Sequence, residues 1–164
     1  ILQMAKATSI IANRGEIIKP RLFKGSREFN SSEFTYSEPI IQGKLDIQQE
    51  WFDFVIDAME EVNKSGTASR VFGNARYPVA GKTGTAQVFT IKQDEEYDSE
   101  KVPDRLKDHS LYIGFAPVDE PKIAVAVVVE NGGFGVTTAT PIAKLVFDYY
   151  LAKKRQKSLE SSKL

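Results

Sequence analysis

Two neighbouring strands are predicted by one stretch, residues 109–130, which reads HSLYIGFAPVDEPKIAVAVVVE. In its first half, Leu111, Ile113 and Phe115 alternate with polar or small residues, which is typical of a strand with one buried face. In its second half, residues 123–129 are apolar throughout, as in a central strand covered on both faces. The turn VDEP between the halves is too short for a crossover, so the stretch predicts an antiparallel hairpin.

A third strand is predicted at residues 79–91, because side chains alternate along its second half. Between it and the hairpin lies a charged segment, residues 92–108, and a loop of this length in a compact domain is more often functional or mobile than idle. Residues 16–45 mix short apolar pieces with Pro, Gly and Ser, which indicates a surface excursion with a short strand at 16–18. The polar tail, residues 153–164, is expected to fray.

Three helices are predicted from apolar residues that recur at helical spacing, over residues 1–14, 47–63 and 140–152. Asp46 and Gln49 form a capping-box pattern at the start of the second helix. Thr140, followed by proline, is the expected N-cap of the third. Gly15 and Gly66 are expected to cap the C-termini of the first two, Gly15 in the left-handed conformation. Together with three antiparallel strands, these helices predict an α/β fold of the α+β type.

The composition excludes several classes of function. The chain has 164 residues, of which 41% are hydrophobic, enough for one compact domain. Lys plus Arg equals Asp plus Glu, 22 each, so no net charge directs the chain toward nucleic acid. It has no cysteine and a single histidine, which excludes disulfides, thiol nucleophiles and histidine-rich zinc sites. We therefore expect no metal or other cofactor and no nucleic-acid partner.

The candidate site is a tetrapeptide near the start of the third predicted strand: Lys82, Thr83, Gly84 and Thr85. A lysine ammonium and two hydroxyls can hold a substrate carboxylate by charge-assisted hydrogen bonds. The glycine lets a substrate backbone approach with no Cβ in the way. The strand N–H at Thr85 can stabilise the oxyanion of an acyl-transfer intermediate. The tetrapeptide therefore indicates a binding site for a peptide terminus, at a sheet edge beside a groove.

A second copy of the same pattern occurs at residues 64–67, Lys-Ser-Gly-Thr. It lies at the end of the helix predicted for residues 47–63, where Lys64 complements the helix dipole and Gly66 acts as a cap. We interpret this copy as structural. The copy at residues 82–85 is followed by strand-like alternation, and we assign the site to it.

Longer motifs around the tetrapeptide resemble class B penicillin-binding proteins. Residues 81–89, GKTGTAQVF, preceded by GTA at residues 66–68, are similar to the third-motif region of that family, where Lys-Thr-Gly recurs. Three further segments resemble its elongation-type members, penicillin-binding protein 2: RLKDH at 105–109, GFAP at 114–117 and VENGG at 129–133. The similarity runs in the right order from Ile1 to about Tyr150.

The resemblance implies a serine-type D,D-transpeptidase fold like that of serine β-lactamases, incomplete here, with residues 1–152 forming the C-terminal portion of the domain. It implies an enzyme on the periplasmic side of the bacterial inner membrane that cross-links peptidoglycan stem peptides and is acylated by β-lactam antibiotics. It also implies a partner, the membrane glycosyltransferase of the elongation complex. In the family, residues matching Lys82, Thr83 and Thr85 bind the carboxylate, and the backbone at Thr85 completes the oxyanion hole.

Two other motifs of the family are missing from this chain. No serine precedes a lysine by three positions, and none precedes an asparagine by two. The chain also begins at Ile1 without methionine, inside a predicted helix. We interpret it as a piece of a longer protein whose upstream part carries the nucleophile, and we expect the piece alone to be inactive.

The residues leave some alternatives open. A serine β-lactamase or D,D-carboxypeptidase of the same superfamily, and a non-catalytic binding domain with this fold, are the rival interpretations. His109 follows Asp108 on a predicted strand, where adjacent side chains point to opposite faces, so Asp108 cannot orient it as in a serine triad. We expect His109 to be structural or to anchor a loop as a hydrogen-bond donor.

Overall fold

The centre of the computed structural model, which describes residues 1–88 and 102–161, is a three-stranded antiparallel sheet in the order β5-β6-β7. The strands are β5 (Ala80–Ala86), β6 (His109–Ala116) and β7 (Ile123–Val129). Leu111 in the middle strand pairs with Gly84 on one side and Val128 on the other. The predicted hairpin and third strand are confirmed, although β5 ends before Gln87 and the predicted strand residues 89–91 lie outside the described residues.

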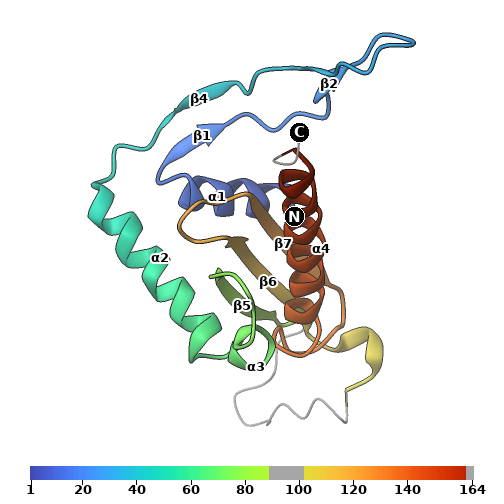
Figure 1. The fold of residues 1–164 in the computed structure, drawn as a ribbon. Coiled ribbons are helices and arrows are strands. Elements are labelled where there is room, and N and C mark those ends of the chain that lie inside the picture. Colours follow the sequence, from blue (N-terminus) through green and yellow to red (C-terminus); the bar gives the residue numbers. More distant parts are fainter. Residues whose placement is uncertain (89–101, 162–164) are drawn as a thin grey trace.

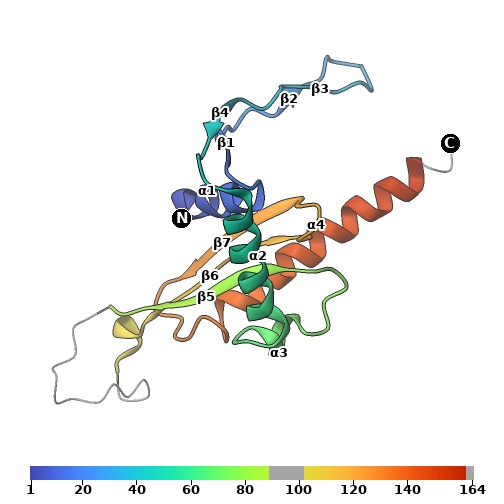
Figure 2. The same cartoon turned by 90° about the vertical axis from the view of Figure 1, so that its left-hand side faces the viewer.

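Helices cover both faces of this sheet, because alternate strand residues supply two separate apolar surfaces. The helices α1 (Leu2–Ala12) and α2 (Gln49–Lys64) bury a cluster with Ala80 and Phe115. The short α3 (Ser69–Phe72) and the long α4 (Ala139–Ser161) bury the larger cluster on the opposite face, around Tyr112 and Phe147. Figures 1 and 2 show α4 crossing the sheet and projecting beyond it.

The predicted surface excursion is a two-stranded arm that leaves the body of the molecule (Figures 1 and 2). At its base β1 (Glu16–Ile18) pairs with β4 (Ile41–Lys44), and farther out β2 (Gly25–Ser26) pairs with β3 (Thr35–Tyr36). The strand expected at residues 16–18 is confirmed. In the described part of the chain, no helix combines the length and apolar character needed to cross a bilayer.

Several predicted helix ends are wrong. The capping box does not form: α2 begins at Gln49, its N-cap is Gln48, and no side chain caps it. Gln49 instead donates to the carbonyl oxygen of Arg14, at 3.5 Å. At the end of α1, the left-handed conformation expected for Gly15 is confirmed, with φ 97°, although Arg14, with φ 50°, takes the C′ position before it. The Gly15 N–H then bonds to the Ile10 carbonyl oxygen at 2.8 Å, as in a Schellman motif.

The predicted ends of α4 also differ from the structure, whereas α2 ends at Lys64, as expected, and the Gly66 N–H caps it by bonding to the Glu61 carbonyl oxygen at 2.9 Å. Thr140 lies inside α4, which begins at Ala139, and its hydroxyl donates to the Gly135 carbonyl oxygen at 2.8 Å. The helix continues to Ser161, so its predicted end near residue 152 is wrong, and the fraying of the tail stays a prediction. Gly66 follows the C-cap Ser65 and does not have a positive φ. A Cβ there would lie 2.8 Å from Val62 Cα, so the residue is small because the chain passes close to the end of α2.

Candidate functional site

The tetrapeptide at residues 82–85 lies on the outer half of β5, a terminal strand of the sheet in the described structure. The strand begins in the core, where Ala80 and Gly81 are buried. Its outer half extends toward solvent. Lys82 and Thr85 are exposed there, and Thr83 and Gly84 are half-buried. An edge strand of this kind offers unpaired backbone groups beside its side chains. The predicted sheet-edge position is confirmed.

A buried network holds the start of β5 in place. The Asn63 amide on α2 donates to the Val79 carbonyl oxygen at 2.9 Å, and the Tyr112 hydroxyl on β6 donates to Asn63 Oδ1 at 2.9 Å. Burial raises the pKa of Tyr112, so its hydroxyl keeps its proton and acts as the donor at every physiological pH. Asn63 therefore joins helix, edge strand and central strand through buried hydrogen bonds.

Gly81 is required because the Tyr112 side chain lies against its backbone. A Cβ at Gly81 would lie 2.1 Å from the Tyr112 hydroxyl oxygen and 2.5 Å from Cζ. On the central strand, Gly114 pairs with Gly81 and approaches the same ring, since its Cβ would lie 2.9 Å from that hydroxyl. The glycine before the tetrapeptide thus lets β5 pack closely over a buried aromatic ring.

The two threonines of the tetrapeptide lie on one face of β5, because side chains two residues apart point the same way. Thr83 Oγ1 is 2.9 Å from the hydroxyl oxygen of Thr67, a residue between α2 and α3. Thr85 Oγ1 accepts a weak hydrogen bond, 3.4 Å long, from the Gly135 N–H. A threonine hydroxyl can accept and donate at once, so the Thr85 hydroxyl keeps its proton for another acceptor.

Lys82 belongs to the opposite face by strand alternation, but its ammonium folds back to the strand and donates to the Thr83 carbonyl oxygen at 2.9 Å. In an antiparallel strand, the N–H and C=O of one residue point to the same side, and residues two apart share that side. If Thr83 directs its carbonyl away from β6, Thr85 directs its N–H the same way. The ammonium, the two hydroxyls and this N–H then lie along one stretch of the strand.

A glycine-rich turn, residues 131–135, covers one face of the site strand. A Cβ at Gly135 would lie 2.4 Å from the Gly84 carbonyl oxygen, so the turn lies directly on the strand backbone. The Asn131 N–H donates to Nδ1 of His109 at 2.9 Å, and the Asn131 side-chain amide donates to the Lys107 carbonyl oxygen at 2.8 Å. His109 therefore anchors a loop, as expected, but as an acceptor where we predicted a donor.

The second copy of the pattern is partly structural. Lys64 is exposed and forms an ion pair with Glu60, one helical turn earlier, at 3.0 Å. The hydrogen bond that the Lys64 ammonium donates to the Glu60 carboxylate raises the pKa of Lys64. Thr67, however, contacts the site strand, which the sequence analysis missed. The available signal was the GTA segment at residues 66–68, which resembles the family but does not by itself indicate a contact with the strand.

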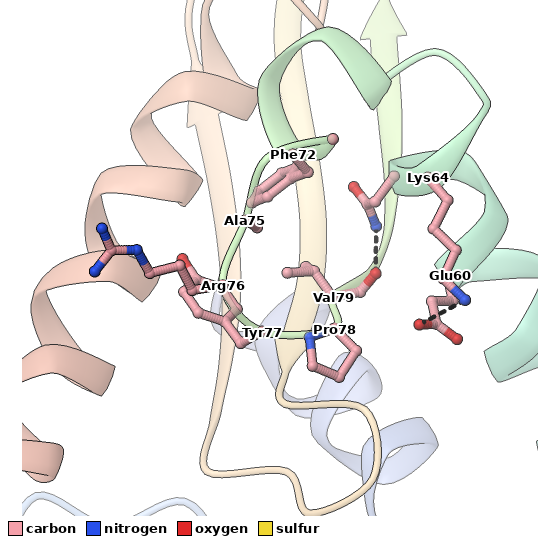
Figure 3. A pocket seen from close by; sticks show the side chains of 10 residues that line it. Glu60, Lys64, Phe72, Ala75, Arg76, Tyr77, Pro78 and Val79 are labelled. Carbon is pink, nitrogen blue, oxygen red and sulfur yellow. Dashed lines mark hydrogen bonds and ion pairs between the residues drawn. The ribbon is translucent and has the colours of Figure 1, made fainter.

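A pocket of about 480 Å³ lies between α2, α3 and the start of β5 (Figure 3). Glu60 and Lys64 pair at one side of it, and Arg76 points away on the other. The pocket has ten lining residues: Glu60, Asn63, Lys64, Phe72, Gly73, Ala75, Arg76, Tyr77, Pro78 and Val79. None of residues 82–85 lines it, so the groove expected beside the tetrapeptide, and the ligand-binding roles of Lys82, Thr83, Gly84 and Thr85, stay predictions. In the described residues, no cluster of His, Asp or Glu could hold a metal ion.

Comparison with known proteins identifies relatives along nearly the whole chain. The peptidoglycan D,D-transpeptidase MrdA of Haemophilus influenzae is 36% identical over 93% of this chain and 24% of its own length. The protein of the same name in Escherichia coli K12 is 35% identical over 88% of this chain and 23% of its own length. The chain thus spans about a quarter of the length of these curated relatives.

Solved structures of penicillin-binding proteins also match this chain. Pseudomonas aeruginosa PBP2 in complex with WCK 5153 aligns with a TM-score of 0.66 and 33% identity, over 92% of this chain and 30% of that one. A ceftriaxone acyl-enzyme complex of penicillin-binding protein A from M. tuberculosis aligns with a TM-score of 0.67 and 27% identity, over 88% of this chain and 30% of that one. The family described as the penicillin-binding protein transpeptidase domain matches residues 1–148. The chain therefore belongs to the transpeptidase family of penicillin-binding proteins and resembles its PBP2 members.

Proposed function

We propose that this chain forms the carboxylate-binding side of the active site of a peptidoglycan D,D-transpeptidase. The observation that supports it is the outer half of β5, where Thr83 and Thr85 carry hydroxyls on one face and the Lys82 ammonium lies against the strand edge. A carboxylate is bound by a cation together with hydrogen-bond donors. The ligand that fits is the C-terminal carboxylate of a stem peptide ending in D-alanyl-D-alanine, or the carboxylate of a β-lactam.

The proposed reaction is acyl transfer through a serine ester. The serine oxygen bonds to the carbonyl carbon of the penultimate D-alanine, the amide C–N bond breaks, and the terminal D-alanine leaves with the proton of the serine. An amine of a neighbouring stem peptide then attacks the ester, forms the new amide and returns the serine hydroxyl. In both steps the Thr85 N–H donates to the oxyanion, and one such donor contributes about 3 kcal/mol to transition-state stability.

The nucleophile is not part of this chain, which has no serine in either of the family's two serine motifs. We therefore propose that the enzyme is a longer protein, in which another part of the transpeptidase domain brings its serine against β5. Without that other part, the 164 residues have no transpeptidase activity. By family resemblance, the enzyme lies on the periplasmic side of the inner membrane and works with the membrane glycosyltransferase of the elongation complex.

The test is acylation of the full-length protein by a fluorescent penicillin. A hydrogen bond to a charged group contributes about 1.5–3 kcal/mol, so Lys82→Ala should slow acylation by roughly 10- to 150-fold without unfolding the protein. Lys64→Ala is the matched control, since it removes a lysine from the other copy of the pattern and should leave acylation nearly unchanged. A normal rate in Lys82→Ala, or an equal loss in Lys64→Ala, would contradict the assignment.

The rival interpretations make different predictions for the same protein. A D,D-carboxypeptidase or β-lactamase passes the acyl group to water, so product analysis with a stem-peptide donor and an amine acceptor separates hydrolysis from transpeptidation. The names of the relatives favour transpeptidation. A non-catalytic binding domain would show no covalent labelling by penicillin at all.

A further inference from the structure

The Thr67 hydroxyl is the one polar group from outside β5 and the glycine-rich turn that the described structure brings to a side chain of the tetrapeptide. Its oxygen lies 2.9 Å from Thr83 Oγ1. Thr67 comes from the connection between α2 and α3, 16 residues earlier in the chain. Nothing in the carboxylate-binding role of the strand itself requires this contact, so its function needs a separate explanation.

The connection holds Thr67 in a defined position. On one side of it the Gly66 N–H bonds to the Glu61 carbonyl oxygen at 2.9 Å, and on the other the Ala68 N–H bonds to the Val62 carbonyl oxygen at 3.0 Å. Ala68 is fully buried, so the backbone next to Thr67 cannot move without opening the core. The backbone that carries the Thr67 hydroxyl is therefore held in place from its own side, independently of the strand.

The direction of the hydrogen bond between the two hydroxyls determines what Thr83 can do. Each hydroxyl has one proton and two lone pairs. If Thr67 donates, Thr83 accepts and keeps its own proton for a ligand. If Thr83 donates, its proton is used and the ligand loses that donor. A carboxylate only accepts hydrogen bonds, so a carboxylate beside Thr83 selects the first direction.

The second hydroxyl of the site has a similar arrangement. Thr85 Oγ1 accepts from the Gly135 N–H, a backbone donor that cannot reverse its direction. If Thr67 donates to Thr83, both threonines accept from a group outside β5 and both keep their own proton available. Hydrogen bonds in such chains polarise one another, which strengthens the bond to the ligand.

We propose that Thr67 is a positioning residue for substrate binding: its hydroxyl donates to Thr83 Oγ1 and so directs the Thr83 proton to the substrate carboxylate. This inference rests on the proposed function. It adds a residue from the α2–α3 connection to a site otherwise carried by the strand, and it predicts an effect on carboxylate recognition and not on the acyl-transfer step.

The experiment uses the full-length protein, with Thr67→Val to remove the hydroxyl at constant shape and Thr67→Ser to keep it. Acylation by benzylpenicillin is resolved into the dissociation constant of the first complex and the rate constant of ester formation. Thr67→Val should weaken the first complex by about five- to tenfold, the size of one net hydrogen bond, with the rate constant changed far less. Thr67→Ser should retain most of the affinity.

Two further measurements separate positioning from a general effect on the fold. With benzylpenicillin methyl ester, which has no carboxylate, Thr67→Val should make little difference. In a Thr83→Val background it should also make little difference, because the group it orients is gone. An equal loss with the ester or in that background would overturn the inference, as would wild-type affinity in Thr67→Val.

These outcomes are distinct from failure of the proposed function. If wild-type protein is acylated and Lys82→Ala is impaired while Thr67→Val behaves as wild type, the function stands and the positioning role falls. If wild-type protein is not acylated at all, both fall together.

Discussion

Adding one methyl group at Gly81 should destabilise the transpeptidase domain strongly. The new Cβ would lie 2.1 Å from the Tyr112 hydroxyl oxygen, 2.5 Å from its Cζ and 2.8 Å from the Ile113 carbonyl oxygen. Two of these atoms belong to a tyrosine with 0% exposure, and the third belongs to the paired strand. Neither neighbour has free space to move into, so Gly81→Ala must displace the Tyr112 ring or separate β5 from β6.

The magnitude follows from three effects. Overpacking a well-packed core costs about 1–3 kcal/mol. Displacing Tyr112 also breaks its bond to Asn63, and a buried group left unpaired costs about 1–3 kcal/mol. Replacing glycine by alanine in a strand returns about 0.5–1 kcal/mol of unfolded-state entropy. The net loss should be about 3 kcal/mol, a large share of the roughly 5–15 kcal/mol by which a domain is stable.

Urea unfolding of the full-length protein measures this loss as a lower midpoint at constant slope. Gly84→Ala is the matched control, because it makes the same chemical change three residues along the same strand. Its Cβ would meet only the Leu111 side chain, with the nearest atom at 3.3 Å, so its cost should stay within about 1 kcal/mol. Equal midpoints for the two variants, or wild-type stability in Gly81→Ala, would refute the packing argument.

Three further outcomes are expected. Tyr112→Phe should lower the unfolding free energy by about 1–3 kcal/mol, measured by urea titration, since the buried Asn63 loses its donor; a neutral result would mean that water reaches Asn63. Burial alone would raise the pKa of Asp148, but hydrogen bonds from Lys144 and Tyr77 outweigh it and lower the pKa below its usual 3.8. The stabilisation by this carboxylate is therefore complete above pH 3.8 and is lost as the pH falls through the lower folded-state pKa. At neutral pH, Asp148→Asn should lower the unfolding free energy by up to about 1 kcal/mol, a value reduced because the carboxylate is partly exposed. The difference in unfolding free energy between this variant and wild type should shrink in acid. A difference that grows in acid would contradict the direction of the pKa shift. Finally, the isolated 164-residue chain should not be labelled by fluorescent penicillin, and labelling would reveal a nucleophile within it.

Much of the fold was predictable because strand and helix periods are local properties of a sequence. The hairpin of β6 and β7 follows from alternation, an apolar run and a four-residue turn. Helix ends were less predictable, because contacts with distant residues compete with local caps. Gln49 was expected to bond within its own helix start, and it bonds to the carbonyl of Arg14, 35 residues away.

The candidate site likewise has parts that local sequence predicts and parts that depend on distant contacts. The tetrapeptide was visible because its four residues are adjacent, and its sheet-edge position followed from the predicted strands. The second copy of the pattern could not be interpreted residue by residue, since Lys64 completes a helix while Thr67 bonds across space to Thr83. Both copies fit one pattern, a lysine, a serine or threonine, a glycine and a threonine, although their residues have different roles.

By itself, the sequence determined the order of the three long helices and the three central strands, the family, and the strand that carries the candidate site, since these depend on residue type and short-range periodicity. Only the tertiary structure decided which residues support that strand. The Asn63–Tyr112 network, the glycine beneath it and the Thr67 hydroxyl all depend on how α2 and its following turn pack on the sheet. Such contacts join residues far apart in the chain, and no local pattern records them.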